Sequence, residues 1–144
     1  MDYGRLSKKL TLPVGAAVPR RLGYDDLVAT AISRTDLADD IRGINASLAL
    51  IKQTRGGTWP TGPVSEDYDY VDLVWHEFEF REGVSFSYVV RDAARAYIGC
   101  CYFYPMGSRT PLSAPPPGRR PCSGACGCSW LTTTPPTATS WRSG

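Results

Sequence analysis

The sequence predicts an α/β fold of the α+β kind, with a mixed sheet of about three strands and three helices in residues 1–104. Apolar and polar residues alternate in two short segments, which is typical of half-buried strands. A third short segment is apolar throughout and indicates a buried strand. Between the first and second segments, apolar residues recur at spacings of three and four, as they do in amphipathic helices.

Length, charge and hydropathy exclude several classes of protein. The 144 residues suit one small domain, and the hydrophobic content of 42% is ordinary. A net charge of +2 is too small to indicate a nucleic-acid or anionic-membrane partner. No apolar run is long enough to span a bilayer, and the first 20 residues lack the apolar core of a signal peptide. We therefore expect a cytoplasmic protein.

The first half of the chain is expected to contain one strand and two helices. Residues 10–14 alternate, which suits a short first strand or an extended arm, and Pro13 favours an edge position. A helix is expected from Tyr24 to Arg34. A second helix is expected to begin after Thr35 as N-cap. Its apolar stripe has spacings of four and three: Leu37, Ile41, Ile44, Leu48 and Ile51.

A third helix and two strands are expected before residue 105. Ser65 is a candidate N-cap, Gly83 ends the helix, and an apolar stripe is expected to face the core. This stripe consists of Val71, Val74, Trp75 and Phe78. Residues 84–90 form the alternating strand, and 91–95 suit a hairpin loop. The apolar run 96–104 is expected to be a central strand, yet the residues after it offer no obvious second neighbour.

The last forty residues, 105–144, differ from the rest. All 14 acidic residues lie between Asp2 and Asp92, whereas this tail is rich in Pro, Ser, Thr, Gly and Arg. Such a composition buries too little apolar surface to offset chain entropy of roughly 1–2 kcal/mol per residue. The sequence therefore predicts a folded portion at 1–104 and a disordered tail at 105–144.

Two segments resemble the GNAT superfamily of acetyl-CoA-dependent N-acetyltransferases. One runs from Asp36-Leu37-Ala38-Asp39-Asp40-Ile41-Arg42-Gly43 to Gly57-Thr58-Trp59-Pro60. The other runs from residues 69–80 through 85–90 to Ile98-Gly99-Cys100-Cys101-Tyr102-Phe103-Tyr104-Pro105. The resemblance covers roughly residues 8–112. It implies acetyl transfer from acetyl-CoA to an amine of a small molecule or peptide, by direct attack of the neutral amine on the thioester.

The chain departs from this family where the cofactor's pyrophosphate would bind. The family has a Gln/Arg-x-x-Gly-x-Gly/Ala loop at a helix N-terminus, where backbone N–H groups bind phosphate. None of the glycines after Tyr104 has that context: Gly107, Gly118, Gly124 and Gly127. We therefore expect a truncated, inactive acetyltransferase-like chain that does not bind acetyl-CoA.

Two alternatives to an inactive acetyltransferase stay open. In one, the chain is a non-catalytic module whose open sheet edge after Tyr104 pairs with a partner strand or with a second copy. In the other, the tail is a wrong-frame translation of a GC-rich coding sequence, and the product has no function. Resequencing that finds no acetyltransferase segment in another frame would contradict the second alternative.

Several residues could carry chemistry, but each has a plainer interpretation. His76, the only histidine, could act as a general base, although a surface or boundary position is favoured. Glu77, Glu79 and Glu82 could deprotonate an ammonium, although a solvated helix face is favoured. Trp59-Pro60 and Tyr68 could wall a substrate pocket, although packing onto the core is favoured.

The five cysteines give no firm site. Cys122, Cys126 and Cys128 have a C-x3-C-x-C spacing that suggests zinc, but the tail offers no fourth Cys or His. Cys100 and Cys101 are expected to be apolar strand residues rather than nucleophiles. We expect no metal, and catalytic and cofactor-binding residues stay unassigned.

Overall fold

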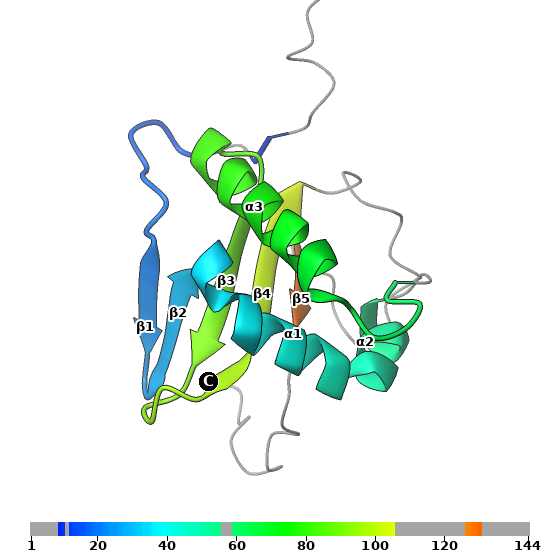
Figure 1. The fold of residues 1–144 in the computed structure, drawn as a ribbon. Coiled ribbons are helices and arrows are strands. Elements are labelled where there is room, and N and C mark those ends of the chain that lie inside the picture. The colour runs from blue at the N-terminus through cyan, green and yellow to red at the C-terminus, as the bar shows by residue number, and fades with distance from the viewer. Residues whose placement is uncertain (1–8, 11, 56–58, 106–125, 131–144) are drawn as a thin grey trace, which may run out of the picture.

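A computed structural model of the chain describes residues 9–10, 12–55, 59–105 and 126–130. Three helices lie on one face of a sheet (Figure 1). The elements are β1 (Arg21–Tyr24), β2 (Leu27–Ala31), the 3-10 turn η2 (Arg34–Asp36), α1 (Leu37–Ala46), α2 (Leu48–Arg55), α3 (Glu66–Glu82), β3 (Phe86–Arg91), β4 (Tyr97–Pro105) and β5 (Cys126–Trp130). The predicted α+β class is confirmed.

The sheet has two more strands than the sequence predicts. Its order is β1-β2-β3-β4-β5, and every neighbouring pair among the described strands is antiparallel, so the expected mixed sheet is not found there. The expectation of an open edge after Tyr104 is wrong, because β5 pairs with β4 from Cys101 opposite Trp130 to Pro105 opposite Cys126. Local pattern could not show this pairing, since the two strands are separated by a long segment outside the described residues.

Neither the strand expected at 10–14 nor the helix expected at 24–34 is found among the described residues. Residues 12–14 form no strand, and the side chain of Val14 is fully exposed. The helix expected at 24–34 is a hairpin in which Tyr24 pairs with Leu27 across a two-residue turn. Asp25 has a φ of 53°, the left-handed conformation that such turns require and that Asp tolerates. Pairing of β2 with β3 outweighs the weak helical preference of this segment.

The helix expected to start after Thr35 is divided in two. Asp36, rather than Thr35, is the N-cap of α1, and its side chain accepts a hydrogen bond from the backbone N–H of Ser33 at 2.9 Å. Ser47 leaves the helical conformation, with φ −119° and ψ 15°, and so separates α1 from α2. Pattern alone missed this break because the apolar stripe continues across it.

The termini of α3 and the following hairpin confirm the sequence prediction. The Ser65 hydroxyl accepts a hydrogen bond from Tyr68 N at 3.3 Å, and Gly83 ends the helix with a φ of 69°. The strand expected at 84–90 begins two residues later, at Phe86. It forms a hairpin with β4, and Arg95 lies in the loop that connects the two strands.

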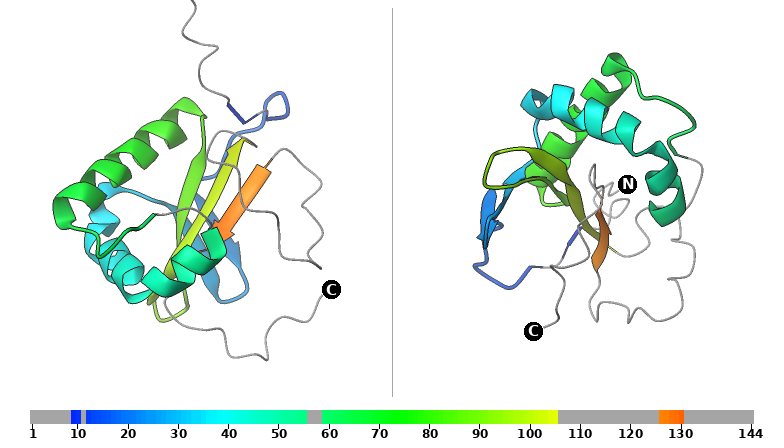
Figure 2. Two further views of the ribbon diagram at one scale, coloured as in Figure 1. Left: turned by 90° about the vertical axis from the view of Figure 1, so that its right-hand side faces the viewer. Right: turned by 90° about the horizontal axis from the view of Figure 1, so that it is seen from below.

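Apolar residues form a core on each face of the sheet. The helix-side core joins Ile44, Ile51 and Leu73 to Val89 and Cys100 on the strands. Figure 2 shows from two further sides that the three helices share this face. On the other face Phe86 and Tyr88 pack with partly buried residues, among them Leu10, Val18 and Phe103. Within the described residues, the helices are too short or too polar to cross a bilayer.

Candidate functional site: a buried polar layer between the helices and the sheet

Charged and polar side chains are buried between α1, α3 and the strands β3 and β4. The fully or nearly fully buried members are Asp40, Asp69, His76, Ser85 and Ser87, each no more than 5% exposed. We call these five residues the buried polar layer. Burial of so many polar groups is costly unless they are hydrogen-bonded, so this layer is where unusual chemistry is most expected.

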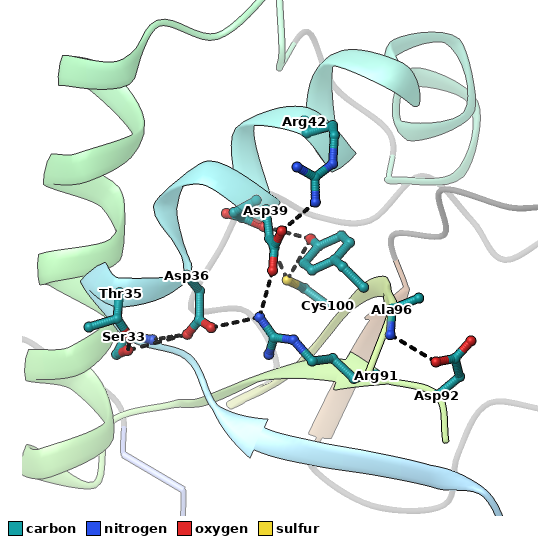
Figure 3. A network of polar contacts seen from close by, with 11 residues as sticks. Ser33, Thr35, Asp36, Asp39, Arg42, Arg91, Asp92, Ala96 and Cys100 are labelled. Atoms are coloured by element: carbon teal, nitrogen blue, oxygen red, sulfur yellow. Dashed lines mark hydrogen bonds and ion pairs between the residues drawn. The ribbon is translucent and has the colours of Figure 1, made fainter. Parts of the chain in front are cut away.

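Arg91 connects the end of β3 to the beginning of α1. Its guanidinium donates to Asp36 Oδ1 and to Asp39 Oδ2, both at 2.9 Å (Figure 3). The hydrogen bond from Arg91 holds the pKa of Asp39 below its ordinary value, and Arg42 pairs with the same carboxylate. This contact fixes α1 on the sheet next to the polar layer.

Asp40 is the residue that α1 contributes to the buried polar layer, and two residues of β4 donate hydrogen bonds to its carboxylate. Tyr97 donates its hydroxyl to Asp40 Oδ1 at 2.7 Å, and the Cys100 thiol donates to the same oxygen at 3.2 Å. Burial raises the pKa of all three groups. The thiol of Cys100 is therefore a buried hydrogen-bond donor and not an activated nucleophile, which agrees with its predicted place in a strand.

His76 lies at the centre of the layer on the inner face of α3. Its Nδ1 lies 3.1 Å from the Ser87 hydroxyl, and its Nε2 lies 3.4 Å from Asp72 Oδ2. The ring also packs against Tyr102, with centroids 5.4 Å apart. The side chain is buried, so the predicted surface or boundary position is wrong. A general base must come within hydrogen-bond reach of its substrate, and in this arrangement the imidazole is enclosed by protein.

The three glutamates of α3 are not brought together. Glu77 forms an ion pair with Arg34 at 2.6 Å, and hydrogen bonds from Arg34 lower its pKa. Glu79 turns inward, where it accepts a hydrogen bond from Ser85 at 2.6 Å. Glu82 is exposed. The prediction of a solvated helix face therefore holds for Glu82 but not for Glu79.

Asp69 is the most unusual residue of the layer. It is 1% exposed, and within the described residues neither carboxylate oxygen has a hydrogen-bond partner. Burial, followed by the charges of Asp40 and Asp72, raises its pKa to about 7. No chemical role was expected for Asp69 from the sequence. Its spacing of four from Leu73 and seven from His76 places all three on one face, and this was the available signal.

Three of the four residues of the expected inward stripe of α3 face outward, and the fourth, Val74, is half-buried. Val71, Trp75 and Phe78 are 67%, 56% and 39% exposed, whereas Leu73 and Phe80 are buried. The spacing of apolar residues predicted the wrong face of α3, because the face that is buried includes two polar residues, Asp69 and His76. Of the other pocket candidates, Tyr68 is exposed, whereas Trp59 packs on the helix-side core and Pro60 is buried, as predicted.

The four cysteines among the described residues lie in the two neighbouring strands β4 and β5. Cys100 and Cys101 are both buried. Cys126 and Cys128 belong to β5, opposite Pro105 and Phe103, while Cys122 lies outside the described residues. In the part of the chain that the structure describes, no three His, Cys, Asp or Glu residues are placed to hold a metal ion.

Comparison with known proteins supports the fold through structure and not through sequence. No protein-family model matches the chain, and no curated protein matches it. Ribosomal-protein-S5-alanine acetyltransferase from Vibrio fischeri superposes with a TM-score of 0.50 and 10% identity, covering 58% of this chain and 46% of that one. The described part of the chain therefore resembles part of the GNAT fold.

A second acetyltransferase of this fold was solved with coenzyme A and without it. RimL, a ribosomal L7/L12 alpha-N-protein acetyltransferase, in its coenzyme A complex gives a TM-score of 0.50 at 14% identity, covering 56% of this chain and 44% of RimL. The apo form gives the same score and identity, covering 64% and 48%. The chain thus spans less than half the length of these GNAT proteins.

Proposed function

We propose that the chain is an acetyltransferase-like protein that carries the first part of a GNAT domain and is inactive in acetyl transfer as it stands. The observation that carries this proposal is the superposition on RimL, which was solved with coenzyme A. The acetyl donor of a complete domain would be acetyl-CoA, and the acceptor would be an amine of a small molecule or peptide.

The N-termini of α1 and α3 do not favour the pyrophosphate of that cofactor. A phosphate site at a helix N-terminus needs free N–H groups and no competing negative charge. The first turn of α1 contains Asp39 and Asp40, and that of α3 contains Glu66, Asp67 and Asp69. The sequence after Tyr104 lacks the glycine-rich motif. We therefore assign no catalytic step to this chain.

Calorimetric titration with acetyl-CoA, accompanied by a thermal melt, tests the proposal. We expect no saturable heat and no change in Tm at roughly 1 mM cofactor, the upper end of ordinary KM values. RimL serves as the positive control. Saturable heat with a raised Tm would show a cofactor site of another kind and would contradict the proposal.

A chimera tests the acetyltransferase-like part of the proposal separately. Residues 106–144 would be replaced by the corresponding second half of RimL, which supplies the missing cofactor-binding segments. If residues 9–105 are a GNAT scaffold, we expect the chimera to bind acetyl-CoA. A folded chimera without binding would show that the likeness ends at the fold.

A further inference from the structure

The outer side of α3 carries an exposed apolar surface that the protein's own core does not use. Large apolar side chains on it are 39% to 67% exposed. We call them the aromatic face of α3: Tyr68, Val71, Trp75 and Phe78. They make up four of the ten large apolar residues that are exposed in the described chain. In Figure 1 this helix lies outermost, with no other described element in front of it. An exposed apolar group of this kind marks an interaction surface more often than chance.

The geometry of the aromatic face suits a cation with an apolar stem. Tyr68, Val71, Asp72 and Trp75 line one open depression, so a carboxylate lies beside an indole and a phenol. Trp75 and Phe78 stack with centroids 5.3 Å apart. The Arg81 guanidinium already lies over the Phe78 ring, 5.3 Å from its centroid. Aromatic faces attract such cations, and lysine and arginine stems cover apolar surface well.

The charge of α3 selects a basic occupant. The helix sequence EDYDYVDLVWHEFEFRE contains seven acidic residues and one arginine. Around the aromatic face, Glu66 and Asp67 are exposed, and the Asp72 side chain is 42% exposed. A second copy docked symmetrically through this face would bring these like charges together, which is unfavourable.

We propose that the aromatic face of α3 binds a basic protein segment. A lysine or arginine of that segment lies with its stem on Trp75 and Val71 and its cation beside the Asp72 carboxylate. This inference does not depend on acetyl transfer, because every residue that carries it lies on the outer side of one helix.

An NMR titration of the full chain, followed at the indole N–H of Trp75, tests this binding. The probes are short acetylated peptides in which leucine alternates with lysine, glutamine or glutamate. We expect the lysine peptide to give a saturable shift, the glutamine peptide to bind at least roughly fivefold more weakly, as the loss of about 1 kcal/mol implies, and the glutamate peptide not to bind.

Matched variants separate a specific site from diffuse attraction. Asp72→Asn is expected to weaken binding of the lysine peptide by roughly three- to tenfold, whereas Asp26→Asn, which removes the same charge from the exposed turn between β1 and β2, changes affinity by less than about twofold. Trp75→Ala is expected to abolish saturable binding of the lysine peptide. Because this variant lacks the indole N–H, its titration is followed at backbone amides of α3. If that variant does not fold, Val71→Gln gives the same test.

Three results would overturn the proposal. Equal affinity for the lysine and glutamine peptides would mean that the face selects apolar surface and not charge. Equal effects of Asp26→Asn and Asp72→Asn would mean that no defined cation position exists. Sedimentation showing a dimer that Trp75→Ala dissociates would mean that a second copy occupies the face.

Discussion

At the scale of single residues, Asp69 and His76 show how far the interior departs from a simple apolar core. His76 has the Ser87 hydroxyl and the Asp72 carboxylate near its two ring nitrogens, whereas Asp69 has no hydrogen-bond partner among the described residues. A buried carboxyl without partners is most stable when it is neutral. Folding therefore favours the protonated form of Asp69.

The raised pKa of Asp69 predicts a pH dependence of stability. The folded-state pKa of about 7 lies above the unfolded value of about 3.9, so the folded state binds more protons. Its contribution to stability is fully present below about pH 4 and is lost as the pH rises through about 7. Because Asp69→Asn cannot ionise, its free energy of unfolding relative to wild type should increase with pH, by up to roughly 4 kcal/mol.

Urea unfolding at about pH 5 and about pH 8.5 should detect roughly 3 kcal/mol of this change, since the rest occurs below about pH 5. Asp67→Asn, on the exposed side of the same helix, is the control and should track wild type at both pH values. A difference between Asp69→Asn and wild type that is the same at both pH values would contradict the assignment.

Arg91 makes the second prediction at this scale. Arg91→Met keeps much of the apolar stem but removes both hydrogen bonds to Asp36 and Asp39, which leaves the partly buried Asp36 without a cation and Asp39 with Arg42 alone. We expect a loss of about 1–3 kcal/mol in the free energy of unfolding, since charged hydrogen bonds of this kind are the stronger ones. Arg42→Met, which removes an exposed pair with the same Asp39, should cost less than about 1 kcal/mol. Equal losses would show that the contact between Arg91 and α1 contributes no more to stability than the exposed ion pair of Arg42.

At the scale of the elements, α3 has well-defined ends but a face that hydrophobicity does not reveal. Ser65 and Gly83 set its limits through a side-chain cap and a left-handed residue. Such signals are local and depend on a few neighbouring atoms, so the sequence contains them in full. The choice between the Val71 face and the Leu73 face depends instead on which groups α1 and the sheet present.

The C-cap of α3 gives the prediction for this scale. Gly83 has a φ of 69°, and a Cβ added there would meet no atom within 4 Å. The cost of Gly83→Ala is therefore backbone strain alone, and we expect about 1 kcal/mol lower stability by chemical denaturation. Gly62→Ala, which also adds its Cβ to open space but has no left-handed φ, is the control and should be nearly neutral. A loss at Gly62 as large as that at Gly83 would contradict this explanation.

At the scale of the whole molecule, β5 decides whether β4 is an edge strand. β4 is long and apolar, and it forms part of both cores through residues such as Tyr102 and Phe103. Such a strand without a neighbour exposes unpaired backbone groups and is an aggregation hazard. Pairing with residues 126–130 covers that edge.

Truncation tests the role of β5. A chain that ends at residue 105 should be less soluble and should melt lower than a chain that ends at residue 130, because only the longer one retains the strand that pairs with β4. Light scattering and a thermal melt of the two chains give the comparison. If both chains are equally soluble and equally stable, β5 does not protect the edge.

The sequence by itself determined the features that depend on near neighbours. The α+β class, the caps at Ser65 and Gly83, and the hairpin of β3 and β4 follow from side-chain period and turn chemistry within a few residues. The resemblance to the GNAT superfamily pointed to the fold that the superposition shows.

Only the tertiary structure decided the rest, because it depends on contacts between distant segments. Residues 27–31 are a strand because β3 lies beside them, and β4 is covered because residues 126–130 return to it. The burial of Asp69 and His76 is likewise set by α1 and the sheet, since a helix carries every side chain on some face and only its neighbours determine which face is inside.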